Sequence, residues 1–159
     1  MINELTFIFT LLSALGAGLI AGTFFAFSIC VMKALFRLPP PHGIAAMQAI
    51  NVVILNPWFL VVFFGTAATC LLLAGWSLFM WHEPGAAWRL AGSGLYLVGV
   101  IVVTIVCNVP RNDALAAVDA DGAEGAALWA KYVPAWTAWN HVRTVAAFAA
   151  AAVLTLSLR

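Results

Sequence analysis

WTAWNHVRT, residues 136–144, decides how the rest of the chain is arranged, because a long uncharged stretch follows it directly. A helix over 134–158 is long enough to cross a bilayer, which needs about 20 mostly apolar residues. Trp136, Asn140 and Arg143 then share one helix face, at the spacing i, i+4, i+7. A charge at the bilayer centre costs roughly 2.5–3.5 kcal/mol. The sequence therefore predicts a polar pocket around Arg143 inside the protein.

The composition is that of an integral membrane protein. Of the 159 residues, 65% are hydrophobic and 8% are charged, and the mean hydropathy is +1.05. Soluble domains carry about 25% charged residues. The net charge of +1 leaves no basic stripe for phosphates, so no nucleic-acid partner is expected. We expect an all-α fold, a four-helix bundle forming one membrane domain over residues 1–159, with spans at about 5–32, 57–81, 86–109 and 134–158.

The connections between these spans carry the main boundary signals. Three prolines in 38–43 predict a non-helical segment, followed by a short amphipathic helix over 44–55. Asn56-Pro57 predicts the N-cap and the first residue of the second span. Pro110 predicts the end of the third span. A surface loop and a second short amphipathic helix are expected before the fourth span begins at Pro134.

A row of small residues runs along the first span, where it recurs every four residues. Such a row lets another helix approach closely in lipid. It serves either packing within the chain or a homo-oligomer. The row consists of Ala14, Gly18, Gly22 and Ala26.

The distribution of basic residues predicts the orientation. In any four-span hairpin the first and third connections lie on the same side, so segments 51–56, 108–113 and 140–143 converge at one end. Lys and Arg prefer the cytoplasmic side. We therefore expect both termini outside and the long connections in the cytoplasm. The basic residues at the converging end are Lys33, Arg37, Arg111, Lys131 and Arg143, against Arg89 and Arg159 at the other.

The converging side chains are hydrogen-bond donors more than metal ligands. The planar guanidinium of Arg143 suits an anionic oxygen, and Asn140 lies one turn before it. No His-x-x-x-His or Glu-x-x-His spacing occurs, so no metal or cofactor is predicted, although a haem on His141 stays open as an alternative. A purely structural role is the other interpretation, with Arg143 tied to helix-end carbonyls or to Asp113.

Three segments resemble the motifs of a membrane family found in bacteria and fungi. They are NVVILNP (51–57), NVPRN (108–112) and WTAWNHVRT (136–144). The family includes the anthrone oxygenases of fungal polyketide pathways, and the resemblance covers nearly the whole chain. It implies a four-helix membrane bundle. We expect the host membrane to be a bacterial inner membrane. For some members it implies oxidation of an anthrone to an anthraquinone by dioxygen.

The predicted function is therefore a membrane oxygenase of the anthrone type that needs no cofactor and acts on a hydrophobic phenolic or anthrone-like molecule. Such an enzyme needs a base, an anion stabiliser and a dry flat cavity. We expect Arg143 and Asn140 to hold the anion, and His141 or Asp113 to be the base. The residues expected to contact the substrate are Asn51, Asn56, Asn108, Arg111, Asn112, Trp136 and Trp139. The alternative is a non-enzymatic membrane protein that binds a lipid or quinone, or assembles with a partner.

Overall fold

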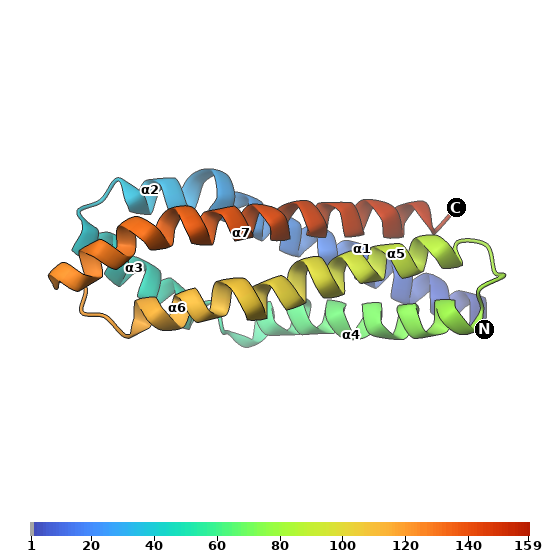
Figure 1. Ribbon diagram of the computed structural model, residues 1–159. Helices are drawn as coiled ribbons and strands as arrows, with labels where there is room; N and C mark the ends of the chain where they lie inside the picture. Colours follow the sequence, from blue (N-terminus) through green and yellow to red (C-terminus); the bar gives the residue numbers. More distant parts are fainter. Residues whose placement is uncertain (1) are drawn as a thin grey trace.

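The chain is an elongated all-helical rod (Figure 1). The computed structural model describes residues 2–159, and the side chains from residue 4 onward, with no strand among them. The elements are α1 (Ile2–Ala26), the π-helical η1 (Phe27–Val31), α2 (Met32–Phe36), α3 (Pro40–Val53), α4 (Pro57–Phe79), α5 (Ala86–Tyr96), the π-helical η2 (Leu97–Val102) and η3 (Thr104–Asn108), α6 (Val109–Ala116) and α7 (Ala123–Leu156).

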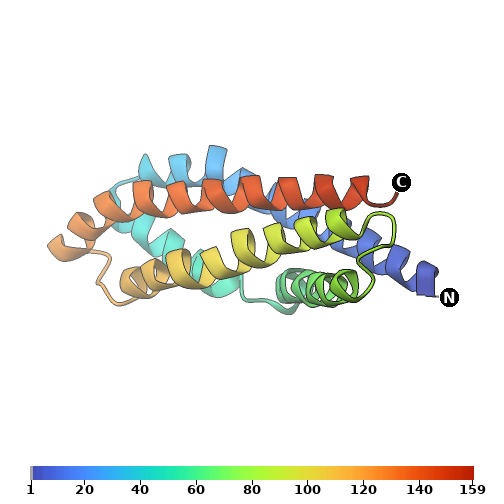
Figure 2. The same cartoon turned by 45° about the vertical axis from the view of Figure 1, so that its right-hand side comes forward.

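The long helices pack side by side along the rod. α7 packs against α1 and α5, and α4 packs against the same two helices. Small residues allow the close approach of α5 and η2 to α7, because a Cβ at Gly92 would meet Leu154 and a Cβ at Gly99 would meet Ala146. Figures 1 and 2 place both termini at one end of the rod and α2, α3 and α6 at the other.

The buried apolar residues form two clusters along the rod. One lies toward the termini and includes Ile20, Phe63 and Leu154. The other lies at the end formed by α2, α3 and α6 and includes Met47 and Trp129. The polar residues described below lie among side chains of both clusters.

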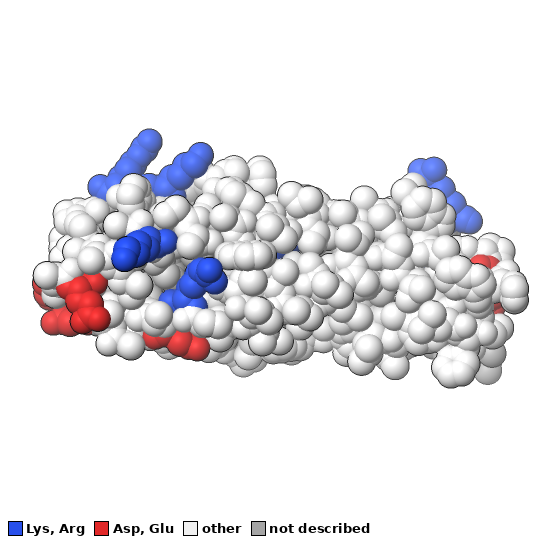
Figure 3. All heavy atoms as spheres, viewed as in Figure 1, with Lys and Arg blue, Asp and Glu red and all other residues white. Residues whose placement is uncertain are grey.

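Three of the described helices are long and apolar enough to cross a membrane: Glu4–Phe36, Pro57–Phe79 and Ala86–Ala116. On the face drawn in Figure 3, charged side chains gather at the two ends of the rod and leave an uncharged band between them. These features are compatible with an integral membrane protein. The α7 helix is not among the three, since Asn140, His141 and Arg143 lower the mean hydropathy of its apolar half.

The boundaries predicted from prolines are partly wrong. α3 begins at Pro40, inside the segment expected to be non-helical, because the first turn of a helix needs no N–H groups. The third span does not end at Pro110. The helix passes from η3 into α6 at Val109, whose N–H donates to the Thr104 carbonyl, and continues to Ala116. The N-cap is confirmed, because Asn56 Oδ1 accepts from Phe59 N at 3.1 Å.

The predicted start of the last helix at Pro134 is also wrong. α7 begins at Ala123 and runs through Pro134 without a break, so the expected separate amphipathic helix is its first part. A proline inside a helix costs about 3 kcal/mol or more. Trp129, Val133 and Trp136 are buried on both sides of Pro134. Their packing offsets the missing hydrogen bond.

The row of small residues on α1 divides between the inside and the outside of the protein. Ala14 is buried, whereas Gly22 and Ala26 are exposed, and a Cβ on Gly18 or Gly22 would meet nothing within 4 Å. Packing within the chain therefore uses only part of the row. The homo-oligomer prediction stays a prediction.

Candidate functional site

A cavity of about 410 Å³ lies beside Arg143. Five parts of the chain line it, namely the end of α1 with η1, then α3 with the turn that follows it, α4, η3 with α6, and α7. Arg143 and Trp136 are the α7 residues in its wall. The cavity is thus built where segments distant in sequence converge.

Arg143 is the buried charge of this cavity, with 4% of its surface exposed. Its Nη2 donates to Asn140 Oδ1 at 2.7 Å, and its Nη1 donates to Thr104 Oγ1 at 3.1 Å. The guanidinium carbon lies 4.1 Å from the centre of the Phe24 ring and 5.2 Å from that of Trp136. Among the described side chains, no carboxylate pairs with Arg143, and its Nε has no hydrogen-bond partner. Its charge is therefore met only by neutral groups.

Asn140 accepts a hydrogen bond from Arg143 and lies on the side of Arg143 away from the cavity. It is fully buried, and its Nδ2 donates to the Phe24 carbonyl and to Ser28 Oγ, both at 2.8 Å. Its Oδ1 is thereby oriented toward the guanidinium. Ser28 lies in η1 and Thr104 begins η3, so both helices that face α7 here carry π-helical segments, which frequently occur at functional sites.

Asn112 forms a second polar group of the cavity wall. Its Oδ1 accepts from Tyr132 Oη at 3.0 Å and from Trp136 Nε1 at 2.8 Å. Because the oxygen takes both donors, the amide nitrogen is directed away from the two rings. In the pair with Tyr132 the phenol is the donor, because an amide oxygen only accepts.

Asn51 adds a further donor. It lines the cavity near Tyr132, and its buried Nδ2 makes no hydrogen bond of normal length among the described residues. Together with Arg143 Nε, it offers a donor without an acceptor. Oxygen atoms of a ligand, carbonyl or anionic, would satisfy such groups.

Most of the remaining wall is aromatic and apolar. Phe59 and Phe63 stack with their ring centres 5.5 Å apart, and Phe24, Phe27 and Trp136 complete the aromatic lining. Flat aromatic ligands pack well against such rings. Asp113 is the one carboxylate among the described lining residues, and it is exposed. The cavity thus combines a buried cation, amide donors, aromatic walls and one acid at a solvent-exposed position.

The cavity brings together five of the residues predicted from the sequence: Arg143, Asp113, Asn51, Asn112 and Trp136. Asn140 lies behind Arg143. Asn108 is buried, and its Nδ2 donates to the Trp136 carbonyl at 3.3 Å.

The remaining predicted residues lie elsewhere. Asn56 caps α4, and the Arg111 side chain donates to the Cys107 carbonyl. Trp139 is exposed, and so is His141, which lines a separate groove beside Lys33. Neither residue is among those that line the cavity beside Arg143.

Sequence reasoning missed several residues of the site. Gln48 Nε2 donates to the carbonyls of Leu115 and Val118, at 2.8 and 3.1 Å. Ser28 Oγ accepts from Asn140 Nδ2, whereas the Thr23 hydroxyl donates to the Leu19 carbonyl of its own helix. A hydroxyl in an apolar span at the depth of a buried arginine is the signal that could have found Ser28 and Thr104.

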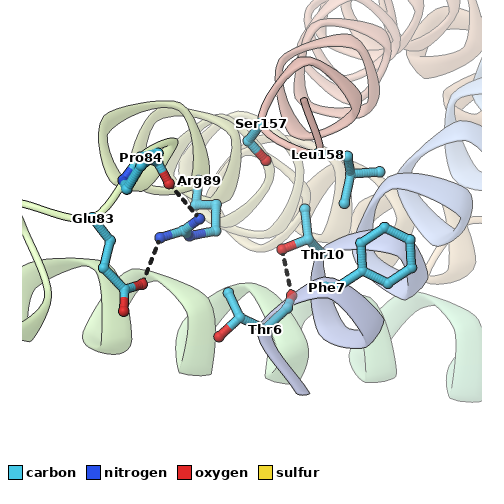
Figure 4. Close-up of a pocket in the computed structure, with 8 residues that line it drawn as sticks. All are labelled: Thr6, Phe7, Thr10, Glu83, Pro84, Arg89, Ser157 and Leu158. Atoms are coloured by element: carbon cyan, nitrogen blue, oxygen red, sulfur yellow. Dashed lines mark hydrogen bonds and ion pairs between the residues drawn. The ribbon is translucent and has the colours of Figure 1, made fainter. Parts of the chain in front are cut away.

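The opposite end of the rod holds a second buried arginine beside a cavity of about 290 Å³ (Figure 4). Arg89 is 6% exposed. Its Nη1 donates to the Pro84 carbonyl at 3.0 Å, and its Nη2 lies 3.4 Å from the Glu83 carboxylate. The pair ties the α4–α5 turn to the start of α5.

No group of three His, Cys, Asp or Glu side chains among the described residues is arranged to hold a metal ion. The prediction that the site works without a cofactor stays a prediction. In comparisons with known proteins, the family model described as anthrone oxygenase matches residues 58–153, which is more than half of the chain. The match covers segments 108–112 and 136–144. No curated protein and no solved structure matches.

Proposed function

The chain belongs to the anthrone oxygenase family, and from this premise we propose that it is a membrane oxygenase that converts an anthrone or a related hydrophobic phenol into a quinone. The proposed reaction uses dioxygen and no cofactor. We also propose that α7 supplies a fourth span, completing a four-helix membrane bundle in a bacterial inner membrane, with both termini outside.

The observation that carries the proposal is the unneutralised guanidinium of Arg143 in the wall of an aromatic cavity. A buried charge without a partner is unfavourable, and an anionic ligand oxygen would compensate it. The enolate or phenolate of a flat aromatic molecule supplies such an oxygen. Its rings would lie among Phe24, Phe63 and Trp136.

The chemistry needs one proton acceptor and one anion stabiliser. Asp113 would remove a proton from the acidic methylene of the anthrone and, because it is exposed, release that proton to water. Arg143 would hold the oxygen on which the negative charge gathers. The electron-rich carbon then bonds to dioxygen, which is reduced to a hydroperoxide. Loss of water from the hydroperoxide gives the quinone, so one anthrone and one dioxygen yield one quinone and one water.

The amides would orient the substrate. Asn51 and the nitrogen of Asn112 are donors at the cavity wall, suited to carbonyl or hydroxyl oxygens along one edge of the rings. Asn140 would act as a positioning residue, since it contacts Arg143 and is not among the lining residues.

A second candidate is a non-enzymatic protein that binds a lipid or quinone, with Arg143 structural. The hydrogen bond from Arg143 to Thr104 favours it, because this bond joins α7 to η3. In that case removing the guanidinium would destabilise the fold, and no oxygen chemistry would depend on it.

Oxygen uptake by the detergent-purified protein tests the proposal. Wild type, Arg143→Lys and the exposed control Arg37→Lys would be given a soluble anthrone, with uptake corrected for autoxidation and quinone followed by absorbance. We expect uptake above background in wild type and in Arg37→Lys. Arg143→Lys should lose most of it, because lysine lacks the planar fork. Wild-type uptake at background, or full uptake by Arg143→Lys, would contradict the proposal, and a Soret band in the purified sample would point to haem.

A further inference from the structure

Part of the cavity wall is apolar and open at the surface. Among the lining residues, Leu55 is 64% exposed, Phe64 is 55% exposed and Ile105 is 58% exposed. An opening used by a water-borne ligand would carry a polar rim. A rim of large exposed apolar side chains instead marks contact with a hydrophobic phase.

The opening lies between two helices that can cross a membrane, so it would face the hydrocarbon of the bilayer. Leu60 and Phe64 belong to Pro57–Phe79, and Ile105 and Val109 belong to Ala86–Ala116, both of which are long and apolar enough to cross a membrane. α4 packs against α5 and η2 but makes at most isolated contacts with η3 and α6. The two helices therefore separate toward this end of the rod, and the gap between them faces sideways.

The side of the cavity between α3 and α6 is closed by hydrogen bonds and buried side chains. Gln48 ties α3 to the Leu115 and Val118 carbonyls at the end of α6. Three apolar side chains are almost fully buried beside these hydrogen bonds: Ile44, Met47 and Leu115. A molecule approaching from the α3–α6 end would have to break these contacts, whereas the sideways opening needs no hydrogen bond to be broken.

We propose that the substrate reaches the cavity sideways from the hydrocarbon of the bilayer, through the opening between α4 and η3–α6. The substrate is accordingly a flat aromatic molecule that dissolves in lipid. Only protons and water need the exposed edge at Asp113. The identity of the substrate rests on the proposed function, but the route can be tested with a ligand that does not react.

The test uses the protein in lipid nanodiscs and 1,8-dihydroxyanthraquinone, which has no methylene to oxidise. Association is followed by the quenching of tryptophan emission after rapid mixing. In a background with Cys30→Ala and Cys107→Ala, the variant Ile105→Cys is treated with benzyl methanethiosulfonate, which places a removable ring at the opening. Val106→Cys is the matched control, because Val106 is 63% exposed on the next position of η3 and does not line the cavity.

We expect the ring at position 105 to slow association by about tenfold or more and a reductant to restore the rate, since obstructed access lowers the association rate constant. The ring at position 106 should change little. Equal rates in the two modified variants would overturn the sideways route, as would a large acceleration by Gln48→Ala in the modified Ile105→Cys protein. Both results would leave the proposed function standing. Failure of wild type to bind the anthraquinone at all would overturn the substrate class and the route together.

Discussion

Each end of the molecule buries one arginine, and the two ends differ in the groups that contact its charge. Arg89 and Arg143 are buried to nearly the same extent, at 6% and 4% exposure. Arg89 has a carboxylate and a carbonyl from its own turn, whereas Arg143 has an amide oxygen, a hydroxyl and aromatic faces. The first charge is neutralised inside the protein. The second remains available to a ligand, which is why the proposed site is placed there.

Removing Arg143 should have the largest effect on function. Arg143→Ala is expected to lower turnover of an anthrone by about a hundredfold to a thousandfold, the usual loss when one donor to a developing oxyanion is removed. Oxygen uptake measures this, and the detergent unfolding midpoint checks the fold. If Arg143→Ala unfolds at a lower temperature but keeps the wild-type turnover, the role of Arg143 is structural, like that of Arg89.

A carboxylate beside Arg143 would make its surroundings like those of Arg89, which already has one. Asn140→Asp places a carboxylate oxygen where Oδ1 now lies, 2.7 Å from Nη2. We expect turnover to fall by about tenfold to a hundredfold, because the guanidinium is then neutralised before the ligand arrives. The second carboxylate oxygen would face the Phe24 carbonyl to which Nδ2 now donates, so the unfolding midpoint is measured beside turnover and is expected to fall. Unchanged turnover would show that an unneutralised guanidinium is not required.

A smaller effect is expected from the hydroxyl that holds Nη1. Thr104→Val removes the bond from Arg143 Nη1 and also the bond that the hydroxyl donates to the Val100 carbonyl of its own helix. The bond to Arg143 is worth about 1 kcal/mol, which corresponds to about fivefold in turnover. The matched control is Thr155→Val, whose hydroxyl bonds only to the Ala151 carbonyl of its own helix and does not line the cavity. Equal losses in both variants would mean that Thr104 acts on stability alone.

The smallest effect is expected at the other end. Glu83→Gln removes the carboxylate from Arg89 and should lower the free energy of unfolding by less than about 1 kcal/mol, since Glu83 is 28% exposed. Turnover should stay at the wild-type value. A loss of turnover would show that the two ends are coupled, and the comparison between them would no longer separate structure from function.

Much of the fold could be predicted from the sequence, because apolar length and Asn56-Pro57 report directly on helices and their caps. The continuation through Pro110 and Pro134 could not, since it depends on a change to π-helical register and on packing by residues such as Trp129. For the site, convergence at one end placed Arg143, Asn112 and Asn51 together.

The direction of individual side chains was harder to predict. Each residue inserted by a π-helical turn rotates the following residues by about 100°, so helical spacing does not extrapolate through η2 and η3 to Asn108. Trp139 was expected to form a cavity wall but lies on the exposed side of α7. Its side depends on how α7 is rotated against α1 and α5, which spacing within one helix does not specify.

The continuity of α7 through Pro134 has a mechanical consequence. Its 34 residues span about 51 Å at 1.5 Å per residue, well beyond the roughly 30 Å of a bilayer's hydrocarbon. In the proposed arrangement α7 crosses the lipid, passes the cavity and extends into the water as one continuous helix. A bilayer of different thickness changes the tilt of such a rod. Because Trp136 and Arg143 lie on α7, such a change in tilt would move two residues of the cavity wall.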